Sequence, residues 1–189
     1  MDHYLDIRLL EDPEFAPQLL MGALVGKLHR ALFDLEADDI GVSFPEHRVG
    51  VKKRTMGSLL RVHGSKQRLG QLLDTSWLSG MRDHITLGTV STVPEQVKHR
   101  VVSRRQFNTG SPSRARRLAK RHDLGLEEAQ RRLAECASRK IELPFVSLNS
   151  RSTGQRFTLF IEHGLLQAQA TSGRFNYYGL SSSATIPWF

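Results

Sequence analysis

The sequence lacks most of the features that mark membrane proteins and secreted disulfide-rich proteins. Its single cysteine, Cys136, excludes an internal disulfide and suits the reducing cytoplasm, where we expect the chain to work. The longest apolar run, near residues 19–26, is too short to span a bilayer. The N-terminus also lacks the positive-then-apolar layout of a signal peptide.

Motifs for metals and nucleotide cofactors are missing too. The eight histidines are scattered, and neither a cysteine pair nor an HExxH motif is present. No glycine-rich loop is placed to cradle phosphates, so we expect neither a metal nor another cofactor. Cys136 is open to two interpretations, a small core residue on a helix or a nucleophile, and we favour the first.

Acidic residues are absent from one stretch, residues 98–121, which reads KHRVVSRRQFNTGSPSRARRLAKR. Nine of the 27 Lys and Arg residues lie there, which leaves 18 in the rest of the chain against 19 Asp and Glu. The formal charge of +8 therefore belongs almost wholly to this stretch. Such a block is typical of a site for a polyanion, because each cation that neutralises a phosphate releases counterions. The alternative is a solvated helix face.

The helical phase of the basic residues favours a site for a polyanion over a solvated helix face. Pro112 suits the first turn of a helix, with Ser111 as a cap before it. At 100° per residue, five cations fall within one arc of about 160°; they are Arg114, Arg116, Arg117, Lys120 and Arg121. Ala115, Leu118, Ala119 and His122 fall on the opposite side. We therefore predict a helix over 112–122 that docks by a thin apolar edge and leaves its cationic face free.

The residues before this helix predict a strand over 98–106, since two adjacent valines favour extended backbone. Alternation places Arg104 and Gln106 on one face of the strand and Arg105 on the other. Arginine can pair with guanine in a major groove, and glutamine with adenine. The strand is thus a candidate reader of bases beside a helix that clamps phosphates.

The first 90 residues predict the order β-α-β-β-α-β. The elements are a strand at 3–10, a helix from Asp12 or Pro13 to Leu35, strands at 40–44 and 58–63, a helix at 65–73 and a strand at 84–90. This order is typical of a ferredoxin-like split βαβ unit. We therefore predict an α+β fold with a ferredoxin-like domain over 1–94, which ends in a linker at 91–96, and a C-terminal domain over 95–189 that carries the basic helix.

One histidine stands out on the first helix. His29 lies on the shoulder of the leucine-rich face, with Gly22 and Gly26 on the same side. Each glycine costs about 1 kcal/mol relative to alanine, so it needs a reason. The reason is either close packing against another element or close approach of a ligand backbone to His29. A lone helical histidine is more often structural, and the sequence leaves a catalytic role open.

The second half continues with a predicted helix at 126–138 and strands at 143–150 and 155–163. Its tail, FNYYGLSSSATIPWF, is interpreted as a strand, a loop and a packed C-terminus, in which Trp188 and Phe189 fill the core rather than contact a ligand. The basic loop at 45–57 is expected to be solvated, with contact to phosphate or to a protein neighbour as the alternative.

The segment SRSTGQRF at 150–157 resembles the CRISPR repeat-processing endoribonucleases of type I-F systems. The similarity extends over the whole chain. The other segments on which it rests are MDHYLDIRLL, His29, IGVSFPEHRVGVK, RRQ, the arginine helix, LPFVSL, YGL and the terminal PWF. It implies a ferredoxin-like domain joined to a divergent C-terminal domain. It also implies an enzyme that cuts precursor CRISPR RNA at the 3′ base of a repeat stem-loop.

The resemblance implies roles for particular residues. The catalytic histidine falls on His29, the active-site serine on Ser150 and the active-site tyrosine on Tyr178. The implied RNA-binding residues are the base-reading Arg104 and Gln106, the major-groove helix residues Arg114, Arg116, Arg117, Lys120, Arg121 and His122, and Phe157, which stacks on the end of the stem. The chain departs from the family where Ser113, Ala115, Lys120 and Arg105 stand. Those departures bear on the repeat sequence and on the number of backbone contacts rather than on the chemistry.

These residue types suit RNA cleavage without a metal, because RNA carries its own nucleophile, the 2′-OH, and a histidine can take its proton near neutral pH. The resemblance further implies that the enzyme stays on its product, within a surveillance complex that holds other CRISPR-associated subunits. The alternative is a non-catalytic RNA-hairpin-binding subunit of a ribonucleoprotein. A DNA-binding regulator is less favoured, since no helix-turn-helix pattern is evident. Proximity of His29, Ser150 and Tyr178 would favour the enzyme.

Overall fold

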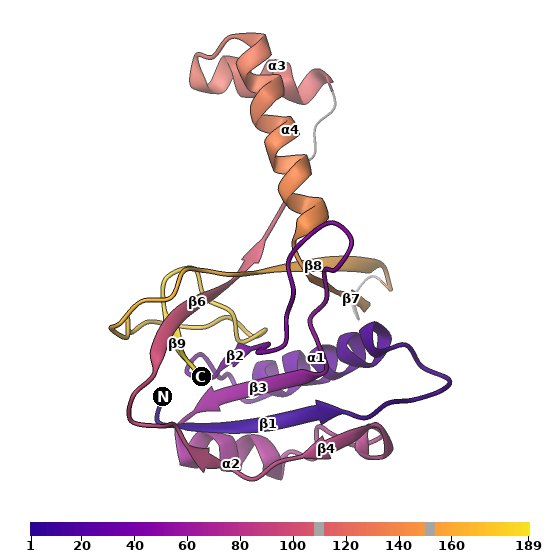
Figure 1. Cartoon of the computed structure of the whole chain (residues 1–189), viewed down its shortest axis with the longest axis vertical. Coiled ribbons are helices and arrows are strands. Elements are labelled where there is room, and N and C mark those ends of the chain that lie inside the picture. The colour runs from indigo at the N-terminus through magenta and orange to yellow at the C-terminus, as the bar shows by residue number, and fades with distance from the viewer. Residues whose placement is uncertain (108–111, 150–153) are drawn as a thin grey trace.

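The computed structural model describes residues 1–107, 112–149 and 154–189, and for residues 112, 113 and 136–141 it describes the backbone alone. The strands form two antiparallel sheets, one in each half of the chain (Figure 1). The fold is α+β, as the predicted elements indicated. Within the described ranges, no helix combines the length and the apolar composition that crossing a bilayer requires.

The first sheet has the strand order β2-β3-β1-β4, with β5 also paired to β1. Its strands are β1 (His3–Leu9), β2 (Gly41–Ser43), β3 (Leu59–Gly64), β4 (Ile85–Leu87) and β5 (Ser91–Thr92). The helices are α1 (Pro17–Asp34) and α2 (Lys66–Asp74), and a short 3-10 helix, η1 (Arg82–His84), precedes β4. The order β-α-β-β-α-β is that of a ferredoxin-like domain, so this prediction is confirmed.

The second sheet has the order β7-β8-β6-β9. Its strands are β6 (Lys98–Arg105), β7 (Phe145–Asn149), β8 (Arg156–His163) and β9 (Thr185–Trp188). Two helices, α3 (Pro112–His122) and α4 (Leu126–Glu142), lie between β6 and β7 in the chain. Figure 1 shows both helices projecting away from the two sheets.

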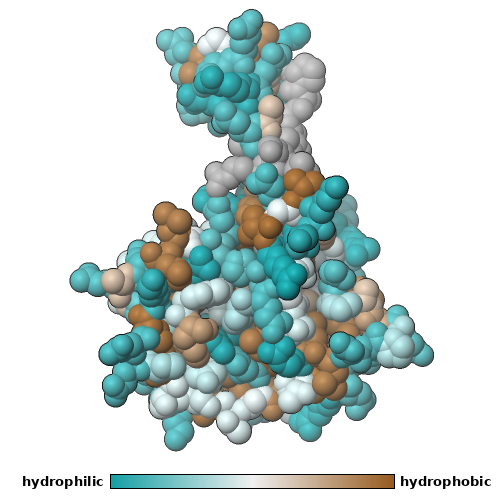
Figure 2. Space-filling view, viewed as in Figure 1, coloured by the Kyte–Doolittle hydropathy of each residue, from teal (hydrophilic) through white to brown (hydrophobic). Residues whose placement is uncertain are grey.

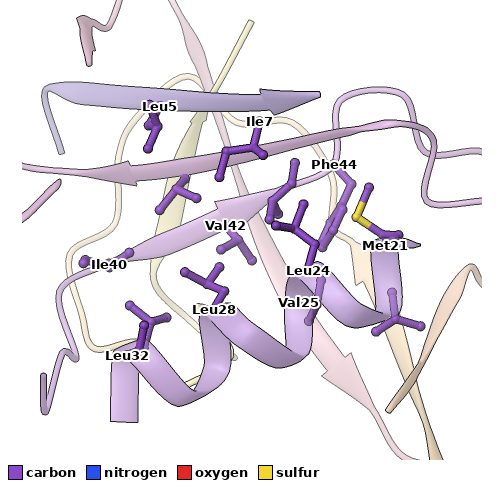
Figure 3. Packing of buried hydrophobic residues seen from close by; sticks show 14 of the residues in the cluster. Leu5, Ile7, Met21, Leu24, Val25, Leu28, Leu32, Ile40, Val42 and Phe44 are labelled. Carbon is purple, nitrogen blue, oxygen red and sulfur yellow. The ribbon is translucent and has the colours of Figure 1, made fainter. Parts of the chain in front are cut away.

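A single hydrophobic core joins the two halves. Leu5 and Ile7 of β1 point toward Leu24 and Leu28 of α1, and all four are buried (Figure 3). The leucines at helical spacing therefore form the predicted core face of α1. The same cluster includes residues of the second sheet, namely Val102, Val146, Leu148, Leu159 and Ile161. The domain boundary near residue 94 stays a prediction.

Another side of α1 packs closely against β7. A Cβ atom on Gly22 would lie 2.6 Å from the carbonyl oxygen of Ser147. One on Gly26 would make only an ordinary contact, 3.7 Å from a methyl group of Leu148. Close packing is therefore the reason for glycine at position 22, because the strand backbone leaves no space for a side chain.

The start of α1 was predicted wrongly, since it lies at Pro17 rather than at Asp12 or Pro13. The Asp12 carboxylate accepts hydrogen bonds from the main-chain N–H groups of Glu14 and Phe15, which closes a separate turn. A helix that began at Pro13 would set the ring of Pro17 against the carbonyl group four residues earlier.

Other segments also differ from their predictions. The strand predicted at 84–90 is limited to β4 (Ile85–Leu87), and His84 belongs to η1. The expected linker contains β5, because the start of β1 pairs with it. The FNYY segment is a turn rather than a strand; the N–H of Gly179 donates to the carbonyl of Asn176 at 2.8 Å. Helix α4 runs to Glu142 rather than to Ser138, because no glycine or proline interrupts it before Pro144. Cys136 lies within this helix, and its side chain lies outside the described ones.

Only one of the two terminal aromatic residues fills the core as predicted. Trp188 is partly buried against the core, whereas Phe189 is 37% exposed, so that prediction was wrong for Phe189. The ring of Phe189 lies 4.1 Å from the guanidinium carbon of Arg61 and meets the ring of Tyr4 edge to face. Arg61 in turn pairs with Asp6, its partner across the sheet. These contacts fasten the end of the second half onto the first.

The basic loop at 45–57 contacts the second half as well, so the expectation of a solvated loop is only partly correct. His47 stacks on His163 with 3.5 Å between ring centroids. The N–H of Gly50 donates to the carbonyl of Glu142 at 2.9 Å, and Val49 beside it is exposed. The loop therefore joins the base of α4 to the first half of the chain.

Candidate functional site

His29 lies on α1, beyond the contact of this helix with β7, and is half-buried. Its Nδ1 atom lies 3.0 Å from the main-chain carbonyl oxygen of Tyr177. Because a carbonyl oxygen can only accept, Nδ1 carries a proton and donates it. In the neutral ring the lone pair is therefore on Nε2, which can act as a base.

Tyr178 stacks on His29. The two ring centroids are 3.9 Å apart and the planes differ by 5°. Burial raises the pKa of the Tyr178 phenol above its ordinary value, while the positive charge of Arg104 acts in the opposite direction. The phenol is therefore protonated at neutral pH and can donate a hydrogen bond next to the imidazole.

A tight turn at residues 176–179 presents both tyrosines to α1. The Asn176 side chain accepts hydrogen bonds from the N–H groups of Tyr178 at 2.8 Å and Leu180 at 3.3 Å. The carbonyl of Gly179 accepts from the N–H of Val42 on β2 at 2.9 Å. Gly179 has φ +70°, and a Cβ atom there would lie 2.6 Å from the Val42 side chain, so glycine is needed on both counts.

Strand β7 runs along α1 toward His29. Gly22 faces Ser147 and Gly26 faces Leu148, so the strand and the helix advance in the same direction. The last described residue of the strand is Asn149. The predicted active-site serine, Ser150, lies outside the described residues. The structure thus brings together two of the three predicted catalytic residues, His29 and Tyr178.

Helix α3 carries the predicted cationic face. Ala115 is buried, and Leu118 and Ala119 are half-buried, where α3 packs on α4. Arg114 is half-buried, and the exposed cations of the helix are Arg116, Arg117, Lys120 and Arg121. In Figure 2 the part of the molecule formed by α3 and α4 is mostly hydrophilic. The thin apolar edge and the opposite cationic face are both confirmed.

Comparison with known proteins agrees with the resemblance seen in the sequence. The family described as "CRISPR-associated protein (Cas_Csy4)" matches residues 4–189. The chain belongs to the Cas_Csy4 family. It is 49% identical, over the full length of both proteins, to "CRISPR-associated endonuclease Cas6/Csy4" of Pseudomonas aeruginosa (strain UCBPP-PA14). It is 46% identical, again over the full length of both, to the protein of the same name from Escherichia coli (strain UTI89 / UPEC).

The other predicted RNA-binding residues of this Cas_Csy4 chain lie on the second sheet. Arg104 is exposed near the end of β6, close enough to Tyr178 to influence its pKa. The strand ends at Arg105, so Gln106, also exposed, is the first residue beyond it. Phe157 is half-buried on β8, opposite Leu148 of β7.

His122 corrects one detail of the prediction. It is exposed, whereas helical phase placed it with the apolar edge of α3. As the last residue of α3 it stands at the corner where the chain turns toward α4, and the N–H of Leu124 already bonds to the carbonyl of Ala119 there. The apolar contact between the helices therefore stops short of it.

Two of the residues at which the resemblance implied a departure from the family have structural partners in this Cas_Csy4 chain. Arg105 pairs with Glu162 on the neighbouring strand β8. Ala115 fills the contact between α3 and α4. Lys120 is exposed. The described side chains do not include that of Ser113.

Tyr177 is a site residue that the sequence did not reveal. Its contribution to His29 is a main-chain carbonyl group, which every residue possesses, so the residue type carries no signal. One hint in the sequence is that Tyr177 directly precedes Tyr178, the first residue of the YGL segment that carries the family resemblance.

Proposed function

We propose that this chain is an endoribonuclease that cuts the repeats of precursor CRISPR RNA at the 3′ base of their stem-loop, without a metal ion. The names of the two full-length relatives described above support the activity. The chemistry rests on one observation: the Tyr177 carbonyl holds the His29 ring so that Nε2 is its basic nitrogen, and Tyr178 stacks on that ring.

His29 acts as the general base in this proposal. Its Nε2 takes the proton of the 2′-OH next to the scissile phosphate. The 2′ oxygen forms a bond to phosphorus while the bond from phosphorus to the 5′ oxygen breaks, and the 5′ oxygen leaves with a proton from water. The products end in a 2′,3′-cyclic phosphate and a 5′-OH. A positioned base contributes about 10²–10⁴-fold to such a rate.

Two further residues position the reacting groups. Tyr178 orients the imidazole by stacking on it, and its protonated phenol donates to the scissile phosphate. Ser150 follows Asn149, where β7 ends after running along α1 toward His29. We assign it to the ribose, whose alignment for in-line attack is a contribution of position rather than of proton transfer.

The RNA stem is bound by the second half of the chain. The cations of α3 contact phosphates, which fixes position without reading sequence. Arg104 and Gln106 read bases, and Phe157 stacks on the end of the stem. Side chains cannot generally read the deep major groove of A-form RNA. We therefore assign the base contacts to the lower end of a short hairpin, where the groove opens.

The enzyme keeps its product because the residues that hold the stem are not those that cut it. Breaking one bond beyond the stem leaves the contacts of α3, Arg104 and Gln106 intact. The cut RNA and this chain would then join other CRISPR-associated subunits in a cytoplasmic surveillance complex, with this chain at the 3′ end of the RNA.

The decisive experiment is incubation with a CRISPR repeat hairpin in EDTA, followed by analysis of the RNA ends. We expect cutting at the 3′ base of the stem, with 2′,3′-cyclic phosphate and 5′-OH ends. A deoxyribose at the cleavage-site nucleotide should block cutting and leave binding nearly unchanged. Tight binding of the unmodified hairpin without any cutting would instead support a non-catalytic RNA-hairpin-binding subunit.

A further inference from the structure

Two exposed aromatic side chains lie next to the candidate catalytic pair. Phe33, one turn after His29 on α1, is 59% exposed, and Tyr177 is 37% exposed. Their rings meet edge to face, with 5.2 Å between centroids and 75° between planes. Tyr178 thus contacts His29 while its chain neighbour Tyr177 contacts Phe33. The mechanism above uses only the carbonyl group of Tyr177, so it leaves both rings without a role.

Phe33 lies on the side of His29 that points away from β7. Gly22 and Gly26 face β7, His29 follows, and Phe33 is about 6 Å further along the helix at 1.5 Å per residue. The residues proposed to hold the stem belong to the second half of the chain. A strand that leaves the stem and passes His29 would reach Phe33 within about two nucleotides, at 3.4 Å for each stacked nucleotide.

Cations flank the two aromatic rings. Arg30 is exposed and lies about 60° around α1 from Phe33. The side chain of Arg174, three residues before Tyr177, is 88% exposed and pairs with Asp38 at 3.1 Å. Aromatic faces beside basic side chains are the combination that binds single-stranded nucleic acid without sequence preference.

We propose that Phe33 and Tyr177 form a stacking site for an unpaired base on the 3′ side of the cut. This inference rests on the proposed function. The base bound there belongs to the RNA that departs after cutting, so the site acts on the substrate and not on the retained product. By holding the departing strand, it keeps the 5′ oxygen in line with the attacking 2′ oxygen.

The test compares two RNAs and two proteins. One RNA is a repeat hairpin with several unpaired nucleotides 3′ of the cut, and the other carries abasic sites at the first two of those positions. Phe33→Ala and the abasic sites should each slow single-turnover cutting by about 5- to 150-fold, the range for loss of one base–aromatic contact. The variant acting on the abasic RNA should cut little more slowly than either change causes alone. Affinity for the product hairpin, which ends at the cut, should not change.

Three variants control for folding and for surface apolarity. Phe33→Trp keeps an aromatic face and should retain the rate. Phe33→Leu keeps an apolar contact with Tyr177 but no aromatic face, so it should behave as Phe33→Ala. Phe15→Ala is the control for surface apolarity. Phe15 precedes the start of α1, is 40% exposed and meets His84 edge to face. Its loss should leave the rate of cutting unchanged.

Several results would overturn the stacking site. One such result is that Phe33→Ala slows the cutting of intact and abasic RNA equally. Another is that this variant binds the product hairpin more weakly. In either case the aromatic pair would only hold the turn at 176–179. A third is a wild-type enzyme that cuts both RNAs at the same rate, which removes the stacking site and leaves the proposed function intact. Failure of the wild type to cut either RNA would refute the proposed function itself.

Discussion

His29 and Tyr178 are held by neighbours on several sides, whereas the cations of α3 sit on a projecting helix that packs on α4. The candidate catalytic pair lies where α1, β2 and the turn at 176–179 meet, with a carbonyl bonded to the imidazole and a ring stacked on it. Helix α3 packs on α4 through Ala115 and its apolar neighbours, and both helices project from the sheets (Figure 1).

The difference matches what each region has to do. Proton transfer and in-line attack need atoms placed within about 0.5 Å, which packed elements can supply. Phosphate binding needs charge at the surface, and the attraction between charges falls slowly with distance, so a projecting helix suffices. Loss of a group in the first region should therefore affect the rate of cutting, and loss of one in the second should affect affinity and its salt dependence.

The largest effect should come from His29→Ala. We expect cutting of the repeat hairpin to slow by about 10²–10⁴-fold, because the general base is lost, while hairpin affinity stays the same. Single-turnover cleavage and a filter-binding assay measure the two quantities. His3→Ala, which removes a half-buried histidine on β1, is the matched control. Cutting by His29→Ala at the wild-type rate would rule out this mechanism.

Arg104→Ala tests the point where the two regions meet, since Arg104 is a candidate base reader and also lies near Tyr178. Binding of the cognate stem should weaken by about 1–3 kcal/mol, with relaxed preference at one base pair. Competition among stems that differ at single pairs measures this. Lys98→Ala, at the exposed start of the same strand, is the control. Equal losses on cognate and scrambled stems would remove the base-reading role.

Gly22→Ala and Gly26→Ala test how closely α1 packs on β7. The methyl group at position 22 would collide with the carbonyl of Ser147, so we expect a loss of about 1–3 kcal/mol in the free energy of unfolding. At position 26 the methyl group meets only a leucine side chain, so the better helix propensity of alanine should raise stability by up to about 1 kcal/mol. Urea unfolding compares the two, and equal effects would contradict the close contact.

Acid should lower the free energy of unfolding, because the packed region contains buried histidines. Burial lowers the pKa of His63 to about 3 and, with the nearby His47 and Arg100, that of His163 to about 2. Below pH 6.5 the unfolded chain gains protons at these sites before the folded chain does. The free energy of unfolding therefore falls as pH decreases, by about 1 kcal/mol for each histidine between pH 6 and 5.

His163→Phe isolates one of these contributions. Among the described residues neither ring nitrogen of His163 has a hydrogen-bond partner, so phenylalanine removes the titration without breaking a bond. Urea unfolding at pH 5, 6 and 7 should show a flatter pH dependence for this variant. An unchanged slope would mean that other groups govern the acid sensitivity.

The smallest effect should come from Arg116→Ala on α3. Loss of one phosphate contact should weaken every hairpin alike and reduce the slope of log affinity against log salt by about 0.9 or less. The cutting rate at saturating RNA should not change. Arg131→Ala on α4, which removes a partner of Glu128, is the control. Loss of discrimination between stems would show that α3 also reads sequence.

Much of the fold could be predicted because it depends on periodicity. The leucines of α1 and the alternation of β1 predicted the ferredoxin-like order, and the cations of α3 predicted its exposed basic face. The predictions failed where one local contact prevails over a pattern. Asp12 closes a turn before Pro17 can begin the helix, and Asn176 and Gly179 close a turn where tyrosines favour a strand.

By itself, the sequence determined which residue types are available. These are a cationic helix, a strand before that helix that contains Arg104, and a histidine on the shoulder of an apolar helix. These follow from composition and from the spacing of neighbours along the chain. Only the tertiary structure decided that Tyr178 stacks on His29 and that the carbonyl of Tyr177 sets its tautomer. The hydrogen bond joins residues that are 148 positions apart in the chain. No pattern among neighbouring residues can encode a contact over such a separation.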